Sequence, residues 1–261
     1  MKRHYAHNHS TNVAAIISVV AMVGLVSTLD VNVAAEGEES ADGLIQRVVE
    51  QTTRSGVAVR ATRDMRAGTV SGKHQGWMEV ETVVTPAGGF TFKVLGEGGS
   101  ERTREKVFKS LLEAEGPTWR AGARDAAALT PDNYEFEPLP SSRSGQVQIR
   151  LKPRREDSKL IDGILTVSSD GYPLLLEGKM AKAPSFWVKS VTVVKRYGRF
   201  AGVALPTTIE SLADVKMIGK SSFTMNYRYS EVNGRPIANS VASAAPSFEP
   251  SAEILALFAR H

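Results

Sequence analysis

The side chains that most often carry out chemistry are scarce in this chain. None of its 261 residues is a cysteine, which excludes disulfides, thiolate nucleophiles and cysteine metal sites. Three of its five histidines, His4, His7 and His9, lie in the N-terminal segment. His261 is the last residue, so only His74 remains inside the predicted domain, in a turn-like stretch where we expect it on the surface. We therefore expect no histidine triad and no cluster of histidine metal ligands.

Carboxylates could still support hydrolysis. Trp77, Glu79 and Glu81 fall on one face of a predicted strand, and an aromatic ring beside two acids occurs in sugar-handling sites. Acids two residues apart on a strand are equally typical of a solvated face. We keep a carboxylate-based hydrolase using Glu79 or Glu81 as a minor alternative. The main prediction is a protein that is not an enzyme and that has no metal and no cofactor.

Basic residues gather in the second half of the chain. They could contact anionic headgroups or an acidic partner protein, or they could form the solvated outer face of a sheet. The formal net charge of +4 is too small to indicate a nucleic-acid partner. The residues concerned are Lys152, Arg154, Arg155, Lys179, Lys182, Lys189, Lys195, Arg196 and Arg199.

The N-terminal segment has the pattern of a secretory signal. Lys2 and Arg3 precede an apolar run over 13–29, and small residues offer a cleavage site after Ala35. The alternative is an uncleaved anchor, because the run is long for a signal core and short for a membrane span. We expect a soluble exported protein from which residues 1–35 have been removed.

Two amphipathic helices are predicted among the elements that must position any site. The first covers 40–54, where apolar residues recur on one stripe. The second begins after Ser100, a good N-cap, and stops near Glu115 at a Gly-Pro pair. The glycines of GEGGS, 96–100, complete neither phosphate-binding motif, so we interpret them as a tight turn before that helix.

Apolar and polar residues alternate along much of the remaining chain. The stretch between Pro117 and Ser144 is irregular, apart from a short helix around 126–129. This spacing predicts an α+β fold with one large, twisted antiparallel sheet and helices against one face. The predicted strands are 57–61, 77–85, 90–94, 147–152 and the segments GILTV, YPLLLEGKM, FWVKSVTVVKRY, GVALPTTIESLA and SFTMNYRY.

One face of this sheet carries a large apolar surface. Two helices cannot easily cover about ten strands, so we expect the concave side to be incompletely closed and to hold an apolar ligand. Phe108, Leu111 and Leu112 of the second helix would face in as lid residues. The predicted wall residues are Phe90, Phe92, Ile149, Leu151, Phe223, Met225, Tyr227 and Tyr229.

Several stretches after about Gly96 occur in an order that is typical of one family: GEGGSERTREKVFKSLLEAEGP, DNYEF, LKPRREDSKLIDGILTV, EGKMAKAPSFWVKSV and GVALPTTIESLADVKMIGKSSFTMNYRY. On these residues the chain resembles the outer-membrane lipoprotein-sorting proteins, which are related to the periplasmic lipoprotein carrier LolA. The resemblance implies a strongly curved antiparallel sheet that forms an incomplete barrel, with helices across its concave face. It also implies a periplasmic location. Carriers of this kind shield acyl chains, and relatives such as RseB bind or sense other envelope components.

We therefore predict a periplasmic carrier or binding protein, expected to be a monomer, for lipoprotein acyl chains or another lipid-like ligand in a hydrophobic cavity. The alternative is an envelope interaction or sensor module that binds a partner protein, as RseB-like proteins do. The domain should cover 36–234, followed by a flexible connection and a short C-terminal helix within 235–261. This helix either docks on the protein's own core or binds a partner.

Overall fold

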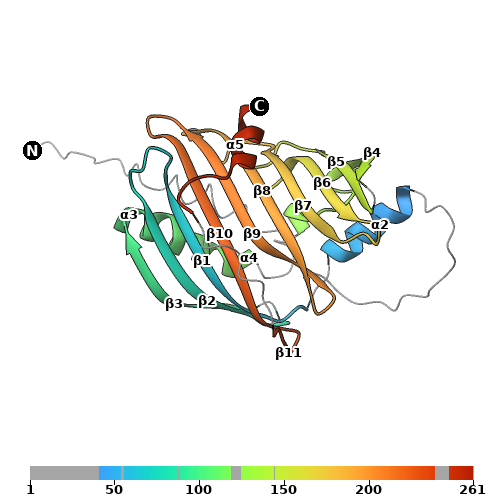
Figure 1. Cartoon of the computed structure of the whole chain (residues 1–261), viewed down its shortest axis with the longest axis horizontal. Helices are drawn as coiled ribbons and strands as arrows, with labels where there is room; N and C mark the ends of the chain where they lie inside the picture. The colour runs from blue at the N-terminus through green and yellow to red at the C-terminus, as the bar shows by residue number, and fades with distance from the viewer. Residues whose placement is uncertain are drawn as a thin grey trace, which may run out of the picture.

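One open antiparallel sheet with helices on both of its faces makes up the fold (Figure 1). The computed structural model describes residues 41–53, 56–87, 89–118, 125–143, 145–238 and 247–260. The predicted signal peptide and its cleavage site lie outside the described residues. The strands are β1 (Val59–Thr69), β2 (Gly76–Val84), β3 (Phe90–Gly99), β4 (Tyr134–Arg143), β5 (Gln146–Pro153), β6 (Ile161–Ser168), β7 (Pro173–Met180), β8 (Val188–Phe200), β9 (Val203–Val215), β10 (Gly219–Val232) and β11 (Arg235–Pro236). The helical elements are α2 (Ala41–Thr52), α3 (Glu101–Thr103), the π-helical η1 (Arg104–Lys109), α4 (Ser110–Thr118), the 3₁₀ turn η2 (Asp125–Ala127) and α5 (Ala252–Ala259).

The strands follow one another as a meander, except that β1 pairs with β10. The order is β3-β2-β1-β10-β9-β8-β7-β6-β5-β4, and β11 pairs with β10. All of these pairs are antiparallel. The path leaves β3 and β4 as the two edges, so the α+β fold with a large antiparallel sheet is confirmed and the sheet is not closed.

Strand alternation places one row of side chains on the inner, concave face. In β2 buried and half-buried residues alternate without interruption. Register pairs connect the inner residues of eight neighbouring strands in a single line, and each of them is 0 or 1% exposed. From β2 to β5 the row consists of Met78, Met65, Met225, Ile209, Lys195, Leu176, Leu165 and Ile149. Every member except Lys195 is apolar.

Helices cover the two faces of the sheet differently. α2 and the continuous segment α3–η1–α4, residues 101–118, bury their apolar stripes in the same core as the inner row. The helix α5 packs on the outer face, where Ile254 joins Val194 and Leu212 in a separate small cluster (Figure 1). The described part of the C-terminal tail therefore docks on the protein itself, with Ile254 1% exposed.

The bend before α3 requires a glycine at one position. Gly99 has a φ of +76°, and a Cβ atom there would lie 2.4 Å from the carbonyl oxygen of Gln75. The predicted cap follows directly, because the Ser100 side chain accepts a hydrogen bond from the N–H of Thr103 at 3.4 Å. This turn fixes where the helical segment leaves the sheet.

Two elements differ from the sequence-based expectations. The stretch predicted as irregular contains β4, which the sequence obscures with Pro138 and Pro140. Prolines cannot donate to a ladder, but β4 is an edge strand, where one side needs no partner. The second helix continues through Pro117 to Thr118 instead of stopping near Glu115. Pro117 lies in the last turn, where few further helical hydrogen bonds depend on its missing N–H.

Candidate ligand-binding interior

A pocket of about 150 Å³ lies between the start of the helical segment and the sheet. Thr103 and Val107 line it from the helical side, and Ala67, Ala213 and Phe223 line it from strands β1, β9 and β10. The pocket exists because the two alanines occupy inner positions where the neighbouring rows carry larger side chains. The pocket could admit a small apolar group without rearrangement of its walls.

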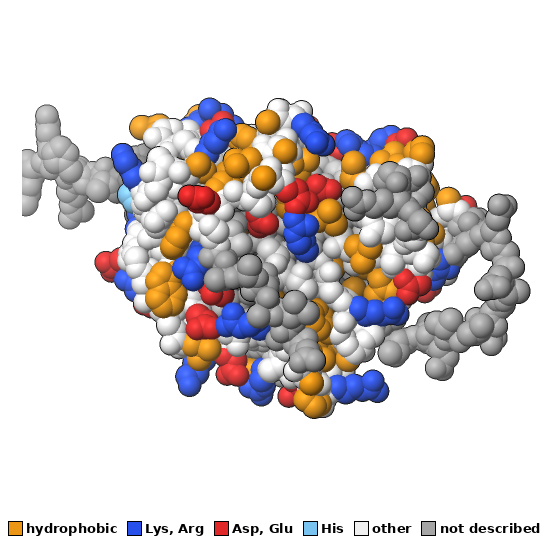
Figure 2. Space-filling model, in the orientation of Figure 1, with side chains coloured by type: hydrophobic (Ala, Val, Ile, Leu, Met, Phe, Trp, Pro, Cys, Tyr) orange, Lys and Arg blue, Asp and Glu red, His pale blue; other side chains and the backbone are white. Residues whose placement is uncertain are grey.

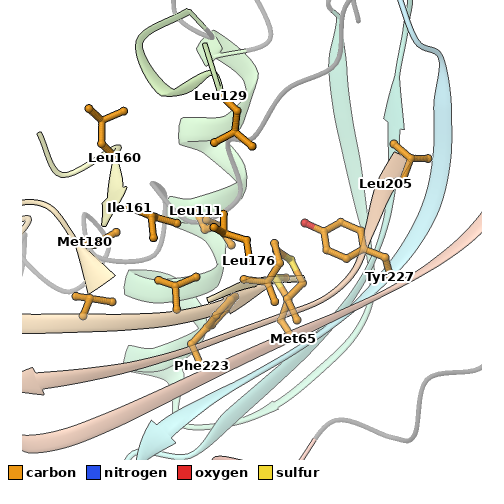
Figure 3. Packing of buried hydrophobic residues seen from close by; sticks show 14 of the residues in the cluster. Met65, Leu111, Leu129, Leu160, Ile161, Leu176, Met180, Leu205, Phe223 and Tyr227 are labelled. Carbon is orange, nitrogen blue, oxygen red and sulfur yellow. The ribbon is translucent and has the colours of Figure 1, made fainter. Parts of the chain in front are cut away.

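Most of the predicted site residues lie around this interior but are packed against one another. Phe90 is half-buried against the core, and Phe92, on the edge strand β3, is 37% exposed. Only Phe223 of the predicted set lines the described pocket, and its ring lies 6.3 Å from that of Phe108. The other residues of the predicted set are all buried in the core: Leu111, Leu112, Ile149, Leu151, Met225, Tyr227 and Tyr229. Figure 3 shows side chains of the sheet, among them Met65, Leu176 and Phe223, gathered around Leu111 of α4.

A buried ion pair joins the helical segment to the sheet. The Arg63 guanidinium on β1 donates two hydrogen bonds to the Glu115 carboxylate on α4, at 2.5 and 2.9 Å, and both side chains are 4% exposed. Arg63 also donates to the Thr82 hydroxyl at 3.1 Å. Burial alone would lower the pKa of Arg63, but the Glu115 carboxylate, together with Tyr227 and Tyr229, outweighs this effect and raises that pKa, so the guanidinium stays charged. This is a bidentate contact in a low-dielectric interior.

Aromatic rings enclose the guanidinium of Arg63. Its carbon lies 5.4 Å from the centre of the Phe90 ring and 5.1 Å from that of Tyr227. Tyr227 stacks on Tyr229 at 5.9 Å, and the Tyr229 hydroxyl donates to the Pro206 carbonyl at 2.6 Å. These rings hold the arginine in one position and separate it from solvent.

Lys195 is the exception in the inner row. It is 0% exposed, and among the described residues its Nζ has no hydrogen-bond partner. Burial lowers the pKa of Lys195 to about 7, an effect that the Glu115 carboxylate only partly offsets. Two residues further along β8, the ring of Tyr197 lies 5.2 Å from this Nζ, and its hydroxyl is also without a partner in the described part of the chain.

A second tyrosine shows what a fully partnered buried hydroxyl looks like here. Tyr134 is 2% exposed, and its oxygen accepts a hydrogen bond from the Ile161 N–H at 3.0 Å. Burial raises the pKa of Tyr134 to about 12. Its role is structural, because it ties β4 to the start of β6.

The outer face of the sheet accounts for the acidic residues that could have supported hydrolysis. Glu79 pairs with Arg228, and Glu81 pairs with Arg60 at 3.3 Å. Figure 2 shows that basic and acidic side chains are interspersed over this face. Each glutamate thus forms its own ion pair on this face, and neither lines a described pocket.

Two further searches cover only the ranges that the structure describes. No group of three or more metal-ligating side chains occurs there. None of the helices there is long and apolar enough to cross a membrane.

The comparisons with known proteins are limited to structural similarity. No family model matches the chain, and no curated protein matches it significantly. Three solved structures align over most of its length. A LolA superfamily protein from Nitrosomonas europaea shares 10% identity, with 78% of this chain and 98% of that one covered and a TM-score of 0.39. A domain from Vibrio parahaemolyticus assigned to the outer-membrane lipoprotein-sorting proteins shares 11%, with 76 and 93% covered and a TM-score of 0.36.

The third structure is a DUF1329 family protein from Desulfovibrio piger, with 12% identity, 79 and 94% covered and a TM-score of 0.38. The names of the first two structures are those of the family that this sequence resembles.

Sequence reasoning missed the three charged residues of the interior. Arg63 follows Ala61 with the two-residue period of a strand that was recognised only as far as 61. Lys195 follows Val191 and Val193 in the same way, but it was grouped with the basic residues of a solvated face. Glu115 lies near the end of an amphipathic helix, and nothing in the sequence around it indicates that its side chain is buried. For the two strand residues, strict alternation would have indicated burial.

Proposed function

We propose that the protein is an exported binding or carrier protein for an acyl chain or a similar apolar ligand. The observation that carries this proposal is the pocket between the segment 101–118 and the apolar concave face of the sheet. Dispersion and desolvation would hold the ligand, without any bond being made or broken. The N-terminal apolar run supports export, and a periplasmic location belongs to the same proposal.

The pocket is too small for a long acyl chain in its present form. A cavity of about 150 Å³ accommodates a molecule of the size of benzene. The segment 101–118 would therefore have to move away from the sheet, as a lid over the larger apolar face. The Arg63–Glu115 pair would be the contact that opens and closes with it, because it joins α4 to β1 directly. Phe108, Leu111 and Leu112 would then be exposed to the ligand, as the sequence predicted for lid residues.

Native mass spectrometry of the exported protein, purified without detergent, tests whether a lipid-sized mass is carried. The variant Ala213→Phe should fill the pocket from β9 and reduce the bound fraction several-fold. The matched control is Ala252→Phe, which places the same ring on an exposed position of α5. Wild-type protein that carries no ligand and takes up no apolar probe would contradict the proposal. Equal ligand loading of Ala213→Phe and the control would show that the ligand neither occupies this pocket nor enters through it.

A second candidate function is the interaction module, which would dock an envelope protein or a membrane. It is favoured by an apolar rim at one end of the sheet, where Phe186 is 75% exposed and Met217, at the β9–β10 turn, is 94% exposed. Lys216 lies over the Phe186 ring at 3.6 Å. The double variant Phe186→Ser and Met217→Ser should abolish such docking but leave ligand loading unchanged. Loss of loading in this variant would count against a separate docking role.

A further inference from the structure

The charges buried inside the sheet do not balance. Arg63, Glu115 and Lys195 are the buried charged side chains among the described residues. Arg63 and Glu115 neutralise each other through two hydrogen bonds. Lys195 stands on β8, three strands away from β1, and has no such partner. The interior therefore holds one basic group more than its acids can satisfy.

The surroundings of Lys195 combine an apolar wall with a second buried polar group. Its neighbours in the row are Ile209 and Leu176, so the Lys195 side chain is flanked by apolar residues on both neighbouring strands. The Tyr197 hydroxyl provides a second unused donor on the same side of the same strand. Tyr197 also lines a pocket of about 160 Å³ together with Tyr172 and other residues, so open space adjoins the ring that Lys195 contacts. Buried polar groups without partners are rare in proteins and often mark a functional site.

We propose that Lys195 and Tyr197 bind the carboxylate of a long-chain acid whose alkyl chain lies along the apolar inner row. This inference rests on the proposed function, because the acid can reach Lys195 only if the concave side opens to a ligand. It narrows the class of ligand from any acyl chain to a free long-chain acid. The acyl chains of a lipoprotein are neutral esters and amides, which would leave Lys195 without a counter-charge.

The donors favour a carboxylate over a phosphate. One ammonium and one phenol match the two oxygens and the single charge of a carboxylate. Phosphate sites in proteins usually have arginine clusters or several backbone N–H groups, which supply more donors and more positive charge. In the low-dielectric interior a single charge-assisted hydrogen bond is strong enough to select the ligand.

The lid would contribute to this selection. Glu115 is the charged group that acts most strongly on Lys195, and it belongs to α4. When α4 moves away from the sheet, the Glu115 carboxylate moves with it and no longer stabilises the protonated form of Lys195. The carboxylate of the ligand would then stabilise that form in its place. A neutral ligand of equal length offers no such replacement.

The test compares three probes of one chain length: dodecanoate and dodecyl phosphate, used below their micelle concentrations, and 1-dodecanol, used below its solubility limit. Binding to the wild-type protein is measured by calorimetry at one pH and one salt concentration. Dodecanoate should bind about 10- to 100-fold more tightly than dodecanol, as expected for a charge-assisted hydrogen bond. Dodecyl phosphate should bind more weakly than dodecanoate. Tighter binding of the phosphate would overturn the assignment to a carboxylate.

Two variants locate the effect. Lys195→Met keeps most of the side-chain length and removes the amine, and it should lower dodecanoate affinity to the level of dodecanol without weakening dodecanol binding. The matched control is Lys189→Met on the same strand, where the lysine is 58% exposed, and the preference for the acid should persist. If Lys195→Met does not fold, Tyr197→Phe, which removes one oxygen, should reduce the same preference.

The outcomes separate the two proposals. If the wild-type protein binds dodecanoate and dodecanol equally, or if Lys195→Met retains the full preference, the inference about Lys195 is overturned while the carrier function stands. If the wild-type protein binds none of the three probes, the carrier function itself fails.

Discussion

Replacing Lys195 by methionine should stabilise the ligand-free protein, and by an amount that depends on pH. Burial lowers the pKa of this lysine from its ordinary value of 10.5 to about 7. Between these pH values the unfolded chain holds a proton that the folded chain has released. Because the unfolded state then binds more protons, the free energy of unfolding rises with pH, by at most about 1.4 kcal/mol per unit.

The size of the effect follows from the same two values. At pH 7 the lysine should cost the folded protein about 4 kcal/mol, and at pH 9.5 about 1 kcal/mol. Lys195→Met removes this cost and fits the row of methionine, isoleucine and leucine side chains around it. The titratable groups that act on or lie beside Lys195 are Glu115 and Tyr197, and the substitution leaves both in place.

Urea unfolding at pH 7, 8 and 9.5, followed by tryptophan fluorescence, measures this difference. The gap between the variant and the wild-type protein should shrink from about 4 to about 1 kcal/mol over that range. The control Lys189→Met should stay within about 0.5 kcal/mol of wild type at each pH. A variant less stable than wild type at pH 7, or a gap that does not change with pH, would refute the claim that Lys195 is buried without a partner.

The remaining predictions concern contacts that hold the elements in place. Glu115→Gln leaves Arg63 buried without a counter-charge and should lower the free energy of unfolding by about 3–5 kcal/mol, whereas the double variant Arg63→Met with Glu115→Leu should recover most of it. Glu115→Gln should also speed amide hydrogen exchange in α4. Unchanged exchange would argue against the idea that the Arg63–Glu115 pair holds α4 on the sheet. Tyr134→Phe leaves the Ile161 N–H without its acceptor and should cost about 1–3 kcal/mol in chemical denaturation. Ser251→Ala removes the N-cap of α5 and should cost about 1 kcal/mol, with protease cleavage appearing first at the C-terminal helix; resistance equal to wild type would contradict the cap.

Much of the fold was predictable because it depends on local patterns. Alternation along the strands and one apolar stripe per helix sufficed to predict an antiparallel sheet with helices against it. The burial of the predicted wall and lid residues was predictable for the same reason, and nine of these eleven residues are buried in the core. Phe92 follows the same alternation but lies on an edge strand, where no neighbour covers it. Which strand forms an edge is a tertiary property that alternation does not encode.

The charged interior was less predictable, since it depends on which segments meet. The contact between Arg63 and Glu115 joins residues from β1 and α4, and nothing in either segment indicates the other. The two prolines of β4 are acceptable only because the strand has one free side. The docking of α5 on the outer face likewise depends on Val194 and Leu212, outward residues of strands whose inner faces are also apolar.

Lys195 and Arg196 are neighbours in the chain, yet one faces the core and the other pairs with Glu253 of α5 on the outside. Sliding β8 by a single residue would exchange them, forcing a guanidinium into the oily interior and leaving the C-terminal helix without its ionic contact. Few mispairings of this strand could be tolerated. Lys195 and Arg196 thus fix the register of β8 at the centre of the sheet. A one-residue deletion in the hairpin between β8 and β9 should therefore destabilise the fold far more than one in the hairpin between β2 and β3.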